Sequence, residues 1–335
     1  MKNYLYYVGI DVSKQKLDVT FLDASSKKHP QHFVVSNNIK GLQEITSRIS
    51  KLKILLKQAL ISFEDTGVYS LPLCCYLSDQ HMDYWMIPAI EIKRSKGLVR
   101  GKTDKSDSKD IAFYSQTHIH KLKLGNIPDK SLMELRLLFT EREKVIKAIR
   151  LFGSTQEAIG YLPKDVLKET LKINASTVKK MKRTLLHIES RMIAIINANQ
   201  QLKQQSELIQ SIPGIGVQTA IYLILATKAF QSFENWRQLA CYAGVAPFEY
   251  SSGSSIRGRT KVSPYADKKL KSLLNMCAMN AKKCDSELKH YYQRKLKEGK
   301  SKMLVLNNVR CKLLGRVFAV INRGSAYVNT QKFVA

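Results

Sequence analysis

Four acidic residues stand where their carboxylates could converge on metal ions. Asp11 lies in the apolar segment YYVGIDVS, Glu64 ends a second apolar segment, and a predicted helix opens with two further acids, Asp104 and Asp107. The last two are three residues apart and therefore share a helix face. Clustered carboxylates suit Mg²⁺, and a pair of such ions can activate the attacking and leaving oxygens of a phosphodiester. We therefore expect a two-Mg²⁺ site here, with helix caps or surface acids as the alternative.

A second group of residues that could act on phosphate lies in the segment EYSSGSSIRGRTK at 249–261. Its serines could supply a nucleophilic hydroxyl, while the cations of Arg257, Arg259 and Lys261 could stabilise charge on a phosphoryl group. No His or Lys is fixed by its spacing as a general base. By composition alone, the segment is more typical of a solvated Ser/Gly loop.

A third motif, LIQSIPGIGVQTA at 208–220, places Pro213, Gly214 and Gly216 in a tight turn between two helical patterns. This arrangement is typical of a helix-hairpin-helix. Its glycines would let backbone N–H groups approach phosphate oxygens at a helix N-terminus, which gives nucleic-acid contact without sequence preference. The alternative is a turn with a purely structural role.

The acids of the first third must be positioned by a mixed sheet. Two alternating apolar runs in residues 5–24, separated by Lys14 and Gln15, predict a β-hairpin. Further elements are predicted as strands at 32–35, 59–63 and 84–87 and as helices at 39–49 and 71–77. The order β-β-β-α-β-α-β-α is that of an RNase H-like domain, in which Asp11 and Glu64 would lie on neighbouring strands. Another α/β sheet is the alternative, because strand order is not visible in a sequence.

The chain becomes helical after residue 125, and we expect domains at 1–125, 126–207 and 208–335. In the middle domain, seven apolar residues and one asparagine recur at alternating steps of three and four, as in a coiled coil: Val178, Met181, Leu185, Ile188, Met192, Ile195, Asn199 and Leu202. Asn199 would fix the register of this seam. The seam closes either within one chain, as an antiparallel hairpin with residues 135–152, or between two chains, which we favour.

Charge points to a polyanionic partner. The 335 residues include 55 Lys and Arg against 27 Asp and Glu, a net charge of +28, and residues 251–335 hold 19 basic and 4 acidic side chains. This excess predicts nucleic-acid binding, with an anionic membrane surface as a distant second. The composition excludes a disordered chain, and the longest apolar run, at 220–226, is too short to span a bilayer. We expect a soluble, cytoplasmic protein.

Five segments of the chain, taken in order, carry a resemblance to a known family. They are GIDVSK at 9–14, FEDTGVY at 63–69, KTDKSDSKDIA at 102–112, SIPGIG at 211–216 and YAGVAPFEYSSGSSIRGRTKVS at 242–263. Together they resemble the signature blocks of the IS one-ten family of insertion-sequence transposases. That family includes Piv-like DNA invertases and bridge-RNA-guided recombinases.

The resemblance implies a fold and a set of site residues. The N-terminal domain would be RuvC-like, with an Mg²⁺-binding DEDD tetrad at Asp11, Glu64, Asp104 and Asp107. A coiled coil would join it to a mainly helical C-terminal transposase domain, whose catalytic serine precedes an SG glycine and so corresponds to Ser252.

The resemblance also implies partners. These are double-stranded donor and target DNA, a structured non-coding guide RNA and further copies of the chain in a homodimer or homotetramer. No membrane partner is expected, and the protein would act at the nucleoid in a prokaryotic cytoplasm. The expected activity is RNA-guided DNA recombination through Mg²⁺-assisted serine attack and strand exchange. Two alternatives are a RuvC-like nuclease or junction resolvase that uses the four carboxylates and water, and a non-catalytic basic nucleic-acid-binding protein.

Overall fold

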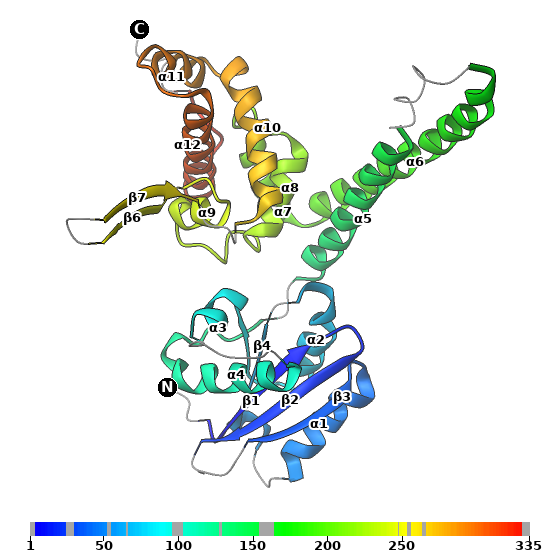
Figure 1. Ribbon diagram of the computed structural model, residues 1–335, viewed down its shortest axis with the longest axis vertical. Helices are drawn as coiled ribbons and strands as arrows, with labels where there is room; N and C mark the ends of the chain where they lie inside the picture. Colours follow the sequence, from blue (N-terminus) through cyan, green and yellow to red (C-terminus); the bar gives the residue numbers. More distant parts are fainter. Residues whose placement is uncertain are drawn as a thin grey trace. The chain divides into compact units, whose positions relative to one another are not determined.

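The computed structural model describes residues 4–24, 30–51, 55–64, 66–95, 103–126, 129–153, 164–246, 248–252, 256–262 and 266–329. Contacts divide the chain into two compact units, Met1–Ile127 and Pro128–Ala335 (Figure 1). The further division of the second unit at residue 207 stays a prediction.

The first unit is built on a five-stranded sheet with the order β3-β2-β1-β4-β5. Its strands are β1 (Tyr6–Val12), β2 (Lys16–Asp23), β3 (Gln31–Ser36), β4 (Ala59–Glu64) and β5 (Tyr84–Ile87). The first three strands pair antiparallel, whereas β4 pairs parallel to both β1 and β5. The predicted hairpin and strands are confirmed, and the sheet is mixed as expected.

Helices cover both faces of this sheet. They are α1 (Ile39–Lys51), α2 (Leu71–Asp79), α3 (Ala89–Ser95) and α4 (Asp104–Thr117), with 3-10 turns η1 (Leu56–Gln58), η2 (Gly67–Tyr69) and η3 (Ile119–Lys121). One core joins apolar residues of α1 and α2 to Val8 and Ile10, and another joins α3 and α4 to Tyr7. Alternate residues of β1 therefore face opposite layers. The predicted helix at 39–49 is confirmed, although Ile39 in its first turn is 57% exposed.

The second unit is mainly helical, as expected. Its elements are α5 (Lys130–Gly153), α6 (Lys164–Ala198), α7 (Gln200–Gln210), α8 (Val217–Ala226), α9 (Trp236–Tyr242), β6 (Phe248–Ser252), β7 (Ile256–Lys261), α10 (Lys268–Cys284), α11 (Ser286–Lys297) and α12 (Lys302–Arg323). Helices α7 to α10 and α12 contribute to one large apolar core, on which part of α5 and α6 also packs. Within the described ranges, none of the helices is long and apolar enough to cross a bilayer.

The predicted seam closes, at least in part, inside one chain. Helices α5 and α6 run along each other in a helical hairpin (Figure 1), with Ile188 and Met192 buried against α5 residues. Arg142, which interrupts the apolar spacing of α5, pairs through Nε with Glu189 Oε1 of α6 at 2.7 Å. A contact between two chains through these helices stays a prediction.

The prediction of one continuous seam across Asn199 is wrong. Helix α6 ends at Ala198, and the side chain of Asn199 accepts a hydrogen bond from Leu202 N as the N-cap of α7. A short amide side chain satisfies an unpaired backbone N–H at a helix start, so it favours a new helix over the continuation of the old one.

The prediction of a loop at 249–261 is also wrong. Strands β6 and β7 form an antiparallel hairpin in which Ser251 lies opposite Arg257 and Ser252 opposite Ile256. The register shifts between Phe248 and Tyr250. Pairing of this kind is made by backbone groups, so a Ser/Gly-rich composition does not prevent it.

Candidate active site

Helix α4, which carries the candidate acids Asp104 and Asp107, lies directly on the sheet at Gly9. A Cβ atom at Gly9 would come within 2.1 Å of the Ser108 carbonyl oxygen and 2.4 Å of Ala112 N, so only glycine allows this approach. One residue pair locks the contact, because the buried hydroxyls of Thr20 and Ser108 lie 2.8 Å apart. Since Thr20 pairs with Gly9 in the sheet, α4 is held over the junction of β1 and β2.

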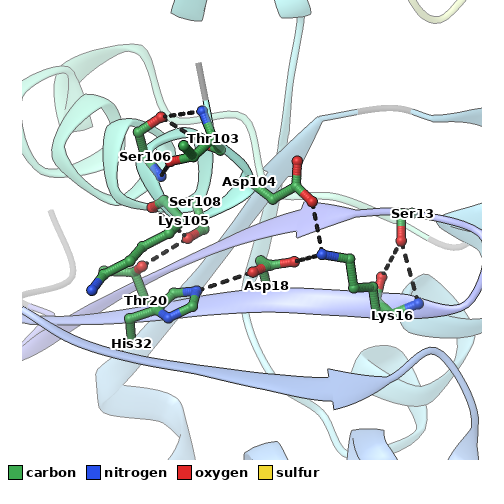
Figure 2. A network of polar contacts seen from close by, with 10 residues as sticks. All are labelled: Ser13, Lys16, Asp18, Thr20, His32, Thr103, Asp104, Lys105, Ser106 and Ser108. Carbon is green, nitrogen blue, oxygen red and sulfur yellow. Dashed lines mark hydrogen bonds and ion pairs between the residues drawn. The ribbon is translucent and has the colours of Figure 1, made fainter. Parts of the chain in front are cut away.

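The start of α4 is capped by a residue other than the candidate acids. Thr103 accepts a hydrogen bond from Ser106 N at 3.1 Å, and Ser106 Oγ accepts one from Thr103 N at 3.0 Å (Figure 2). This reciprocal pair satisfies donors that Asp104 or Asp107 would otherwise serve. The alternative that these two acids are N-caps is therefore wrong, and both stand in the first turn, where the helix dipole favours negative charge.

The strands bring two further acids to the same place. Asp11 follows Gly9 by two residues and so lies on the face covered by α4. The pairing of β1 with β4 extends to Ile10 opposite Phe63, and Asp11 and Glu64 are the next residues of these parallel strands. All four sequence-predicted acids thus come from one region of the first unit.

Their mutual repulsion is visible at Asp11. Burial, followed by the negative charges of Asp107, Asp104, Glu64 and Asp18, raises the pKa of Asp11 from 3.8 to about 6. Burial is the largest cause of this shift, the charges of the nearby carboxylates add to it, and a divalent cation would offset their repulsion. The donor set of hard oxygens therefore fits Mg²⁺. Across the described residues, no group of three or more His, Cys, Asp or Glu side chains is arranged so that it could hold a metal ion as it stands.

Sequence reasoning missed three residues beside these acids, shown in Figure 2. Asp18 lies opposite Asp11 on β2 and is only 4% exposed. Its Oδ1 lies 3.1 Å from His32 Nε2, and its Oδ2 lies 3.1 Å from Lys16 Nζ. Lys16 Nζ also donates to Asp104 Oδ2 at 2.7 Å, which raises the pKa of Lys16. The signal was present, because an acid in the apolar run KLDVTFLD is as unusual as Asp11 in its own strand.

The remaining candidates lie in the second unit. Ser252 ends β6, and Arg257, Arg259 and Lys261 occupy alternate positions of β7. Gly253, which defines the SG pair, lies outside the described residues.

The turn between α7 and α8 contains Pro213, Gly214 and Gly216. The two glycines have different structural roles. Gly214 has a φ of +95°, and a Cβ there would come within 2.7 Å of Ala281 Cβ on α10, so this glycine serves internal packing. Gly216 is the N-cap of α8 and has open space where a Cβ would stand. The backbone N–H of Gly216 hydrogen-bonds the buried Cys277 thiol, so contact with a phosphate would fall to the N–H groups that follow it in the first turn of α8.

Two regions of the chain match models of one protein family. Residues 206–293 match the model described as transposase of the IS116/IS110/IS902 family, and residues 8–153 match the DEDD transposase model of IS110 elements. The chain belongs to the IS110/IS116/IS902 family of transposases. The first matched region contains Ser252, and the second contains Asp11, Glu64, Asp104 and Asp107.

Two relatives match this transposase over nearly its whole length, and a third matches less than half of it. The pilin gene-inverting proteins of Moraxella bovis and Moraxella lacunata are each 25% identical over 324 residues, which cover 96% of this chain and 97% of the relative. An uncharacterised 43.6 kDa protein of insertion element IS110 from Streptomyces coelicolor is 31% identical over 145 residues, covering 43% of this chain and 36% of its own length. The chain is thus a member of a family of DNA-rearranging enzymes.

Proposed function

We propose that this transposase recombines DNA by attack of Ser252 on a phosphodiester, assisted by Mg²⁺ that the four carboxylates of the first unit hold. The observation that carries the proposal is that Asp107, Asp104 and Glu64 lie near enough to Asp11 for their charges to add to the effect of burial, and the two effects raise the pKa of Asp11 to about 6. The strand order β3-β2-β1-β4-β5, with the first three strands antiparallel, supports an RNase H-like, RuvC-like domain as their scaffold.

In this proposal the four carboxylates hold Mg²⁺, as one or two ions. Bound Mg²⁺ would supply Lewis-acid stabilisation of charge on the phosphate and on the leaving oxygen. The chain's own part is to fix the ligands: Gly9 and the Thr20–Ser108 contact set α4 on the sheet. Thr103 caps the helix, so neither Asp104 nor Asp107 serves as its N-cap.

The serine provides the covalent chemistry. The Ser252 oxygen forms a bond to phosphorus while its proton passes to solvent. The bond from phosphorus to the 3′ oxygen of the DNA strand breaks, and that oxygen takes up a proton from solvent to become a 3′ hydroxyl. The released 3′ hydroxyl of a second strand then attacks the phosphoserine and restores the serine. Strands are exchanged without net hydrolysis, which suits rearrangement better than degradation. Arg257, Arg259 and Lys261, on the neighbouring strand, neutralise phosphate charge.

Sequence choice in this proposal lies with a structured guide RNA that pairs with donor and target DNA. The net charge of +28 supports a protein that mainly holds nucleic-acid backbone. Pro213 and Gly214 shape the α7–α8 turn, and the backbone N–H groups that follow Gly216 at the start of α8 would contact a phosphate. A homodimer or homotetramer would allow Ser252 of one copy to serve the carboxylates of another.

The experiment compares three variants in a recombination assay with guide RNA, donor and target DNA. Ser252→Ala and Asp11→Asn should each lower recombination at least about a hundredfold, as expected for loss of a nucleophile or of a group that stabilises the transition state. Ser251→Ala, the neighbouring serine on the same strand, is the matched control and should retain most of the rate. A Ser252→Ala variant that recombines at the wild-type rate would refute the serine step. Loss of recombination when the guide RNA is omitted would support the proposal that the RNA selects the DNA sequence.

A further inference from the structure

The candidate metal site already contains a cation of the chain itself. Lys16 Nζ lies 2.7 Å from Asp104 Oδ2 and 3.1 Å from Asp18 Oδ2, so one ammonium group bridges two carboxylates (Figure 2). Asp104 is one of the four acids assigned to the metal. A divalent ion and this ammonium group would therefore use the same carboxylate.

Two further contacts hold Lys16 in this place. Its backbone is fixed by the tight turn between β1 and β2, in which Ser13 Oγ and Ser13 N both donate to the Lys16 carbonyl oxygen, at 2.8 and 3.1 Å. Its side chain is anchored on Asp18, whose carboxylate is almost fully buried and also contacts His32. A buried carboxylate requires a charged or hydrogen-bonded partner, so Asp18 retains the ammonium group near the site.

We propose that Lys16 is a resident counter-ion that positions Asp104 and competes with the divalent metal for it. Before metal binds, the ammonium group offsets part of the repulsion among the acids and draws the start of α4 toward β2. When metal binds, Asp104 transfers from the ammonium group to the ion, and Lys16 stays paired with Asp18. This inference rests on the proposed function, because it takes Asp104 to be a metal ligand.

Lys14 provides a matched control for this role. It lies two residues away on the same turn, carries the same charge and is exposed, but it makes no ion pair with any other described residue. Loss of either lysine removes one positive charge from the neighbourhood of the acids. Only loss of Lys16 also removes a direct competitor for Asp104, so the difference between the two variants isolates the contact.

The experiment measures Mn²⁺ binding to the full-length protein without nucleic acid, by electron paramagnetic resonance of the free ion. Lys16→Met should bind Mn²⁺ about two- to five-fold more tightly than Lys14→Met, the size expected for one partly exposed ion pair. Lys16→Arg keeps the charge and should stay within about twofold of the wild-type affinity. Equal affinities for Lys16→Met and Lys14→Met, or a tighter Lys16→Arg variant, would overturn the proposal.

An Asp104→Asn background separates this inference from the proposed function. There the carboxylate under competition is gone, so Lys16→Met and Lys14→Met should bind Mn²⁺ equally. If Asp104→Asn alone binds Mn²⁺ as tightly as the wild type, Asp104 is not a ligand and both the ligand set and the counter-ion role fail. If Asp104→Asn weakens binding but the two lysine variants do not differ in the wild-type background, only the role of Lys16 fails.

Discussion

Asp11 is the residue at which the fold concentrates negative charge. It is partly buried, lies opposite Asp18 and is repelled by three further acids, which together raise its pKa to about 6. Because the folded-state pKa is above the ordinary value of 3.8, folding favours the protonated form. The contribution of Asp11 to stability is therefore complete below about pH 4 and is lost as the pH rises through 6.

Replacement of Asp11 by Asn should consequently stabilise the metal-free protein at pH 7.5. The gain should be at most about 1–2 kcal/mol, because partial exposure reduces the effect of the pKa shift. The difference in stability between variant and wild type should grow between pH 4 and pH 7, and Mg²⁺ should raise the melting temperature of the wild type alone. Thermal unfolding across this pH range checks the prediction, and a variant less stable than the wild type at pH 7.5 would contradict it.

Helix α4 is the element that assembles the site, since it supplies two of the acids and meets β1 without an intervening side chain. Gly9→Ala would force the Ser108 carbonyl away from β1 and should cost about 1–3 kcal/mol of stability, as overpacking does. It should also weaken Mn²⁺ binding, because Asp104 and Asp107 move with the helix.

The matched control for Gly9→Ala is Gly315→Ala in α12, where the added Cβ has open space. That change should leave metal binding intact and stabilise the helix by up to about 1 kcal/mol. Chemical denaturation and Mn²⁺ titration of both variants provide the measurements. A Gly9→Ala protein with unchanged stability and affinity would show that α4 does not depend on this close approach.

Periodicity predicted the five strands of the first unit and its helices α1 and α2, because each of them carries a local pattern, whereas α3 was not predicted. The hairpin, the β4 strand that ends at Glu64 and the acids of α4 all follow from alternation and from residue type. The β6–β7 hairpin did not follow, since its stability comes from backbone pairing and its side-chain composition is that of a loop. Asn199 was assigned to a seam because spacing alone cannot distinguish a core position from a helix cap.

The part of the site that sequence could not supply is the network around Asp18. Its contacts with Lys16 and His32 join residues from two strands, and the contact of Lys16 with Asp104 spans 88 positions of the chain. The alternation of β2 does place Asp18 on the face of Asp11, once the turn at Lys14 and Gln15 is accepted. Pair contacts between distant segments require the sheet register, which no local pattern contains.

At the scale of the whole molecule, charge and organisation agree with a protein that handles nucleic acid. The net charge of +28 contrasts with the acids around Asp11, so the positive charge that would attract a polyanion lies elsewhere on the chain. The helical hairpin of α5 and α6 exposes large apolar residues, with Leu186 67% and Leu151 73% exposed. These are candidates for contact with another copy of the chain.

The most direct test of the proposed serine chemistry is to trap the covalent intermediate. Recombination reactions containing Mg²⁺ should be stopped with denaturant and digested with protease, and the DNA-linked peptide identified by mass spectrometry. The account predicts a phosphodiester between DNA and Ser252 that forms in the wild type and is absent from Asp11→Asn and from Ser252→Ala. Cleaved DNA with no attached peptide, or an adduct that forms equally well in Asp11→Asn, would contradict it.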